Sequence, residues 1–149
     1  MSNYYFLIIV AVILGVILPV QVAVNSKLGD AVTNPLLAAF ASFFVGTISL
    51  LTYILITGIP LSKLAGAKDA SPISWTGGVL GAIYVAGSII LLPKLGVALT
   101  ISLILAGQML MSVIIDHFGL FGLPVKEISL ARFAGMLLIV IGVVLIRRY

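Results

Sequence analysis

The chain has 149 residues, of which 62% are hydrophobic and 8% are charged, and its mean hydropathy is +1.36. A soluble domain is about half apolar and about a quarter charged, so this composition predicts an integral membrane protein. With one histidine, four carboxylates and no cysteine, the chain cannot form disulfides and offers few ligands for a metal ion. The eight Lys and Arg side chains are expected to meet lipid headgroups rather than nucleic acid.

Five apolar segments follow one another along the chain, and each is long enough to cross a bilayer as a helix of about 20 residues. The segments cover residues 4–26, 35–58, 75–93, 97–117 and 129–147. The alternating pattern of a membrane β-barrel is absent from the sequence. We therefore expect an all-α protein that forms a single five-helix transmembrane domain over residues 1–149.

The first segment carries two amides, Gln21 and Asn25, which lie four residues apart and hence on one helical face. Lipid offers these groups no hydrogen-bond partner, and polar groups inside a membrane usually face a bundle interior or a water-filled cavity. We interpret Gln21 and Asn25 as substrate-binding residues. The alternatives are that they join neighbouring helices, or that Asn25 already lies at the membrane interface.

The third segment combines small and aromatic residues. Gly77 and Gly81 form a GxxxG pattern, which permits close approach of another helix. Glycine next to a cavity also leaves room for a ligand, and Tyr84 and Ser88 lie on roughly the same side of the helix as Gly81. We predict that Tyr84 and Ser88 contribute to substrate binding, with Tyr84 as an aromatic wall.

The fourth segment carries a polar stripe on an otherwise apolar helix. Gln108, Ser112 and Asp116 are spaced four residues apart, and Thr100 extends the row by two turns. Gln108 lies near the centre of the segment, where an unpaired amide costs several kcal/mol. We interpret Gln108 and Ser112 as substrate-binding residues, and the alternative is that they hold helices together.

Asp116 and His117 end the fourth segment. Histidine changes its charge near neutral pH, so the pair is a candidate for a proton-responsive gate. The alternative is a solvated pair at the interface, or a helix end held by local hydrogen bonds.

The fifth segment presents a smooth stripe of Ala131, Gly135 and Gly142, which suits packing against a partner and predicts dimer contact. No P-loop and no credible Ser/His/Asp constellation occurs in the sequence, so we expect neither an enzyme nor a cofactor.

The basic residues are evenly divided between the two sides that five spans would create. One side receives Lys63, Lys68, Lys126 and Arg132, and the other receives Lys27, Lys94, Arg147 and Arg148. Because an excess of Lys and Arg on one side sets the orientation of a membrane protein, this tie predicts dual topology, with copies inserted both ways. The alternative is a weak signal, with orientation set by the first helix.

Several stretches of the sequence are similar to the small five-helix YdcZ family of the drug/metabolite transporter superfamily. They are "GGVLGAIYVAGSIILLPKLGVAL" (77–99), "AGQMLMSVIIDHFGLFG" (106–122), and the earlier "QVAVNSKLG" and "NPLLAAFASFFVG". The stretch "GMLLIVIGVVLI" (135–146) resembles the last helix of small multidrug resistance proteins, where that helix mediates dimer contact. The resemblance implies a prokaryotic inner-membrane protein that forms a ten-helix fold from two inverted copies, as a homodimer, a pair or a fusion.

The small multidrug resistance proteins carry a Glu in the first span, whereas this first span has no carboxylate before Asp30. Proton-coupled cation export by their mechanism is therefore not expected. We expect a secondary-type exporter of a small polar or amphiphilic metabolite, working as an antiparallel dimer of two copies in the lipid bilayer. The alternatives are a non-transporting membrane assembly subunit and a narrow dual-topology channel.

Overall fold

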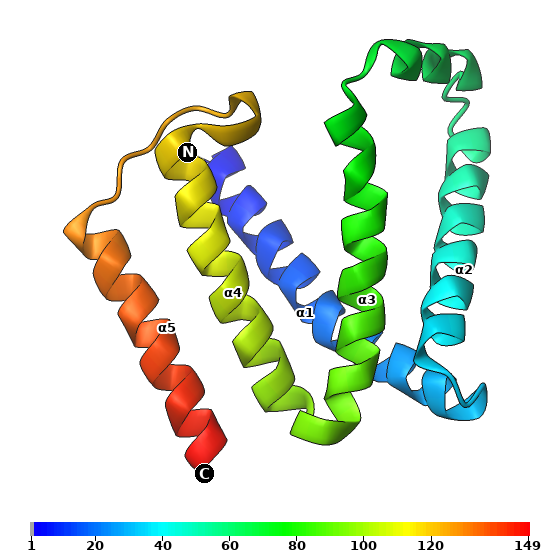
Figure 1. Ribbon diagram of the computed structural model, residues 1–149. Coiled ribbons are helices and arrows are strands. Elements are labelled where there is room, and N and C mark those ends of the chain that lie inside the picture. Colours follow the sequence, from blue (N-terminus) through cyan, green and yellow to red (C-terminus); the bar gives the residue numbers. More distant parts are fainter. Residues whose placement is uncertain (1) are drawn as a thin grey trace. The chain divides into compact units, whose positions relative to one another are not determined.

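The computed structural model describes residues 2–149, with side chains from residue 4 onward, and all regular structure in this part of the chain is helical. The long helices are α1 (Ser2–Ala31), α2 (Pro35–Ile56), α3 (Thr76–Leu95), α4 (Val97–Phe118) and α5 (Leu130–Arg148) (Figure 1). Each is part of a segment that is long and apolar enough to cross a membrane. The prediction of an all-α membrane protein with five spans is confirmed.

The helix bounds differ from the predicted spans mainly at two ends. Helix α1 passes through Pro19 and continues to Ala31, well beyond residue 26. Helix α3 includes Pro93, so the only residue between α3 and α4 is Gly96, whose φ of +78° suits a residue without a Cβ. The predicted spans leave residues 94–96 between the two helices, but α3 continues to Leu95 and Gly96 alone separates it from α4.

The chain divides into two compact units, Met1–Lys94 and Leu95–Tyr149. Unit 1 holds α1, α2, most of α3 and two short 3-10 helices, η1 (Leu61–Asp69) and η2 (Pro72–Trp75). Unit 2 holds α4, α5 and a short 3-10 helix, η3 (Leu120–Gly122). The prediction of a single domain over 1–149 stays a prediction.

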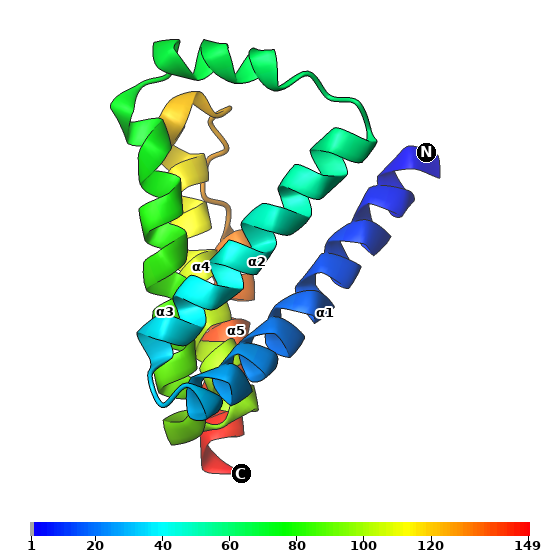
Figure 2. The ribbon, with the colours of Figure 1, turned by 90° about the vertical axis from the view of Figure 1, so that its right-hand side faces the viewer.

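In unit 1, small side chains let the three helices approach closely. The buried cluster joins α2 to α3, and Leu28 of α1 packs against it. Figures 1 and 2 show α3 beside the turn that joins α1 to α2. The members of the cluster are Ala38, Ala39, Val85, Ala86 and Ile89, with Leu28, Val32 and Tyr84 around them. A Cβ placed on Gly29 would lie 3.0 Å from Ile89 Cγ2, and one on Gly81 would lie 3.4 Å from Phe43. The first distance is tight, so glycine at position 29 favours the close approach of α1 to α3, whereas the second is an ordinary van der Waals contact.

The start of α2 is fixed by its own sequence. Asn34 is extended, and its Oδ1 accepts hydrogen bonds from the N–H groups of Leu36 and Leu37 at 2.8 and 3.2 Å. Pro35 follows as the first helical residue, where its missing N–H costs nothing. This cap and the first-turn proline place the α1–α2 turn at 32–34.

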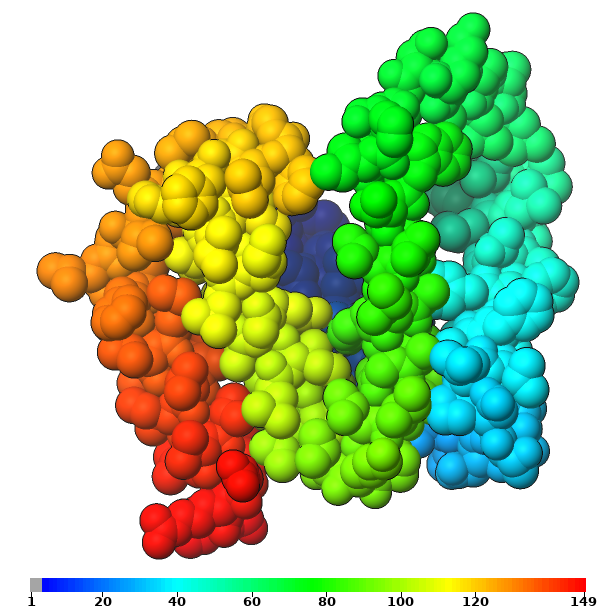
Figure 3. All heavy atoms as spheres, viewed as in Figure 1, coloured from blue at the N-terminus to red at the C-terminus, as the bar shows by residue number. Residues whose placement is uncertain are grey.

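In unit 2, α4 packs against α5 along its length, and Figure 3 shows their side chains in contact (yellow against orange and red). The connection after α4 turns back at once, because Gly119 is left-handed (φ +58°). The N–H of Lys126 then donates to the carbonyl oxygen of Asp116 over 2.8 Å. Ser129 caps α5 by accepting from the N–H of Arg132 at 3.3 Å.

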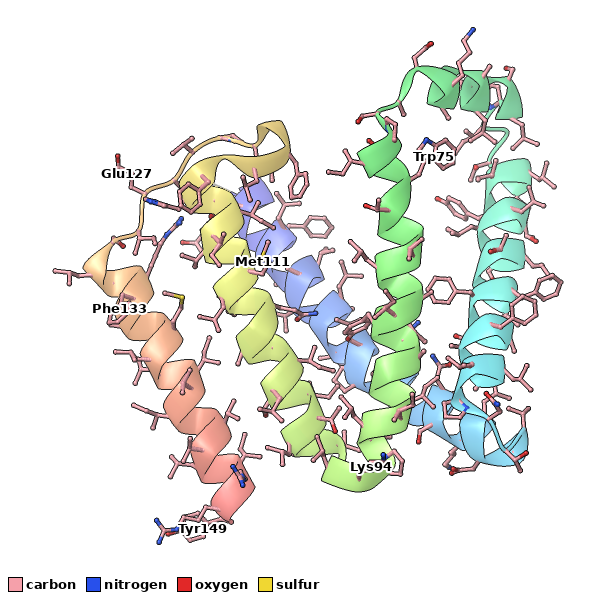
Figure 4. All side chains as sticks on the ribbon, viewed as in Figure 1. Trp75, Lys94, Met111, Glu127, Phe133 and Tyr149 are labelled. Atoms are coloured by element: carbon pink, nitrogen blue, oxygen red, sulfur yellow. The ribbon has the colours of Figure 1, made fainter. Side chains whose placement is uncertain are left out.

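The outer faces of both units are apolar. Side chains such as Met111 and Phe133 are exposed on the helices, while Trp75 lies just before α3 and Lys94 lies near its end (Figure 4). In water so much exposed apolar surface would be unfavourable, but a bilayer solvates it. Trp75 is 64% exposed at the start of a span, as expected for an aromatic anchor at the membrane interface.

Candidate substrate-binding site

Gln21 lines a hollow of about 230 Å³ between α1 and α2 in unit 1. The other lining residues, all on α2, are Ser42, Phe43, Gly46, Thr47 and Leu50. The Thr47 hydroxyl donates to the carbonyl oxygen of Phe43 over 2.8 Å. The Gln21 amide and the Ser42 hydroxyl have no hydrogen-bond partner within residues 4–149, so both are available to a ligand.

Asn25 lies one turn further along α1 and is 6% exposed. Its side chain also makes no hydrogen bond to the part of the chain whose side chains are described. The amide atoms of Asn25 are not among the fully buried unpaired atoms of the described residues, so they can still be reached by a partner. Within residues 4–149, neither Gln21 nor Asn25 joins α1 to another helix by a hydrogen bond.

Tyr84 and Ser88 occupy the interior of unit 1 and do not line the Gln21 hollow. Tyr84 is half-buried against the cluster that joins α2 to α3. Ser88 is 3% exposed, and its hydroxyl donates to the carbonyl oxygen of Val85 over 2.9 Å. The structure thus assigns both side chains contacts within the fold, and their role in substrate binding stays a prediction.

The polar residues of the stripe on α4, in unit 2, differ in their exposure and in their hydrogen bonding. Gln108 and Ser112 are exposed, and the Ser112 hydroxyl donates to the carbonyl oxygen of Met109 over 2.9 Å. The Gln108 amide has no partner within residues 4–149. Thr100 is 1% exposed, and its buried hydroxyl is also unpaired in the described part of the chain. Gln108 is therefore the one group of this stripe that presents an unpaired amide on the surface of the single chain.

Asp116 and His117 take different environments at the end of α4. The Asp116 carboxylate accepts a hydrogen bond from Arg132, at the start of α5, over 3.2 Å. The His117 ring packs edge-on against Phe118, with 4.8 Å between ring centroids, and its Nδ1 is buried without a partner among the described residues. The two side chains do not bond to each other, so the proposed gate has no direct link between its two members.

The small residues of α5 do not share one environment. Gly142 lines a hollow of about 170 Å³ between α4 and α5, with Ser102, Leu105, Ile139, Val143 and Ile146. Gly135 is half-buried and Ala131 is exposed. Gly142 thus faces α4 of its own chain, and the dimer contact of the three residues stays a prediction.

Two features of these sites were not predicted from the sequence. On α2, Ser42 and Gly46 are four residues apart and next to Thr47, a spacing that could have indicated a small polar face. Arg132 follows Asp116 across one connection, so both lie at the same end of neighbouring spans, which could have indicated their ion pair. In the described residues no group of three or more metal-ligating side chains comes together.

Five helices that are long and apolar enough to cross a membrane define the class of a multi-pass membrane protein. A family model described as "Putative inner membrane exporter, YdcZ" matches residues 6–145, and the chain belongs to this family. Neither the curated proteins nor the solved structures that were compared gave a match. The predicted family and the location in the inner membrane are confirmed, and the family indicates a transporter rather than an enzyme.

Proposed function

We propose that this protein exports a small polar or amphiphilic metabolite as a secondary-type transporter, working as an antiparallel dual-topology dimer. The observation that carries the proposal is the Gln21 hollow, which places an unpaired amide and an unpaired hydroxyl between two membrane-spanning helices. Polar groups at such a depth are costly and are typically retained for a substrate pathway.

The chemistry of this hollow favours a ligand that needs both donors and acceptors. An amide supplies both, and a serine hydroxyl does the same. None of the six residues that line the hollow carries a charge. A polar uncharged or zwitterionic group suits these partners better than a bare cation, which would need a carboxylate.

A second copy of the chain accounts for two further observations. Gln108 exposes an unpaired amide near the middle of a span, where lipid offers it no hydrogen bond. The Lys and Arg residues are divided four and four between the two ends of the spans, so neither orientation is favoured. An inverted partner supplies polar groups to Gln108 and to the Gln21 hollow. The even division of Lys and Arg allows this partner to insert into the membrane in the opposite orientation.

The proposal is tested by flux measurements on purified protein in proteoliposomes, across a panel of radiolabelled polar metabolites. We expect saturable flux of at least one compound and its loss in Gln21→Leu. Val20→Leu, which changes an exposed neighbour that does not line the hollow, is the matched control. Flux that rises linearly without saturation would favour a channel, and the absence of flux for the whole panel would favour a non-transporting subunit.

A further inference from the structure

A second hollow in unit 1 is separate from the Gln21 site and lies where α1 and α3 end and α2 begins. Its volume is about 500 Å³, within the range of small-molecule sites. The lining residues are Ser26, Gly29, Asp30, Thr33, Pro35, Ile89, Ile90, Pro93 and Lys94. Because these residues lie at the ends of three spans, the hollow is at the depth of the lipid headgroups.

Two opposite charges face this hollow, the carboxylate of Asp30 from α1 and the ammonium group of Lys94 from α3. They are not paired with each other, since the single ion pair within residues 4–149 joins Asp116 to Arg132. Both residues are exposed, and Ile89 and Ile90 line the hollow beside them. Each charge is thus free to bind a complementary group of a ligand.

Ser26 adds a hydroxyl to the same hollow. The residue is 8% exposed, and its hydroxyl has no hydrogen-bond partner among the residues whose side chains are described. The hydroxyl oxygen is not among the fully buried unpaired atoms of this part of the chain, so it can donate to or accept from a ligand in the hollow. By contrast, the Thr33 hydroxyl is already used, because it donates to the carbonyl oxygen of Val32 over 2.8 Å.

The start of α2 also borders the hollow but does not supply the anion site. The N–H groups of Leu36 and Leu37 are bonded to Asn34 Oδ1, so they are not available to a ligand. Lys94 is therefore the group in this hollow that can neutralise an anion.

We infer that this hollow binds a zwitterion, with the cationic group at Asp30, the anionic group at Lys94 and a hydrogen bond to Ser26. The same chemistry occurs in free molecules with an ammonium and a carboxylate group and in the phosphatidylethanolamine headgroup. The inference does not depend on the proposed transport, because it concerns binding at residues that do not line the Gln21 hollow.

The test measures binding to purified full-length protein in nanodiscs. In one arm, calorimetric titrations in phosphatidylglycerol nanodiscs use glycine, β-alanine and γ-aminobutyrate, which hold their two charges at increasing separations. Acetate and methylammonium are the single-charge probes. In the other arm, retention of phosphatidylethanolamine against phosphatidylglycerol is counted by native mass spectrometry. The variants are Asp30→Asn and Lys94→Gln, with Asp69→Asn and Lys27→Gln as controls that remove the same charges outside the hollow.

We expect one zwitterionic probe, or phosphatidylethanolamine, to bind selectively, and each hollow variant to weaken it by about tenfold or more. The control variants should bind like the wild type. Binding only in the first arm identifies a free zwitterion, and selective retention only in the second identifies a headgroup. The inference is overturned if neither arm shows binding, if single-charge probes bind equally well, or if Lys94→Gln and Lys27→Gln behave alike. Flux measurements on the same variants report on the proposed transport separately.

Discussion

Arg132, in the first turn of α5, donates a hydrogen bond from Nη1 to Oδ2 of Asp116, in the last turn of α4, over 3.2 Å. The same Nη1 also lies 3.4 Å from the carbonyl oxygen of Lys126, whose N–H donates to the Asp116 carbonyl oxygen. These contacts join the end of α4, the connection that follows it and the start of α5 to one another. Asp116 is thereby committed to a structural contact, which weakens its interpretation as a free gating group.

We predict that Arg132→Gln lowers the free energy of unfolding of the protein by less than about 1 kcal/mol. The pair is about one third exposed on each side (35% and 36%), and ion pairs of this kind contribute little. Lys126→Gln is the matched control, because it removes one positive charge close to Arg132 in the sequence but leaves both backbone contacts of residue 126 in place. Thermal unfolding in detergent, followed by Trp75 fluorescence, measures both variants. An equal decrease in the free energy of unfolding of the two variants would mean that the positive charge contributes to stability and that its pairing with Asp116 does not.

Gly119 tolerates an added Cβ less well than Gly122, which lies in the same connection. Both have positive φ, +58° and +77°, so an alanine at either position is strained by about 1–2 kcal/mol. At Gly119, however, a Cβ would also lie 2.7 Å from Val125 Cγ2 and 3.0 Å from the carbonyl oxygen of Leu123. Nothing lies within 4 Å of a Cβ at Gly122.

We therefore predict that Gly119→Ala destabilises the protein more than Gly122→Ala, by about 1 kcal/mol or more. The two midpoints of thermal unfolding, measured under one detergent condition, give the difference. If the two variants unfold at the same temperature, the connection relaxes around the added methyl group, and the close approach to Val125 is not required.

The spans were predictable from sequence because the bilayer imposes a simple rule on length and polarity. The segment 97–117 agrees with α4 (Val97–Phe118), and Asn34–Pro35 marks the start of α2 as a cap followed by a first-turn proline. The end of α1 was harder, because the polar residues after Asn25 suggest an interface while the backbone remains helical to Ala31. Hydropathy reports where a helix leaves the lipid, not where it ends.

The candidate site was less predictable, because the spacing of polar residues on one helix does not show which residues of the neighbouring helix line the same hollow. Gln21 stood out as an amide in an apolar span, but the face of α2 opposite it depends on how α1 and α2 pack. Ser88 also looked available from its spacing, yet it lies in the interior of unit 1 and donates to its own helix. A hydroxyl can satisfy its donor locally in a helix, whereas a glutamine amide does so less readily.

Dual topology gives a prediction that this chain is well suited to test, since it has no native cysteine. Single cysteines placed at residue 2 and at residue 149 should each react with a membrane-impermeant maleimide from both sides of the membrane. The even division of Lys and Arg gives neither orientation an advantage. Two lysines added to the 61–75 connection should shift the labelling to one side. Labelling of each native terminus from one side only would exclude dual topology.

The last prediction concerns Gln108, whose exposed amide near the centre of a span has no partner in the described chain. We predict that Gln108→Leu leaves the protein folded, because the amide makes no contact whose loss would unfold unit 2. Removing an unpaired amide from lipid contact should even raise the stability of the isolated chain slightly. Transport should fall sharply, about tenfold or more, if the amide reaches substrate from either copy.

Three measurements on Gln108→Leu distinguish the roles of this residue: the unfolding midpoint, the oligomeric mass in detergent and the flux of the transported compound. Met111→Leu is the control, because Met111 is an exposed residue of the same helix that does not belong to the polar stripe. Normal assembly with lost flux assigns Gln108 to the substrate path. Loss of the dimer together with flux would assign the amide to the contact between copies, and unchanged flux would remove Gln108 from the site.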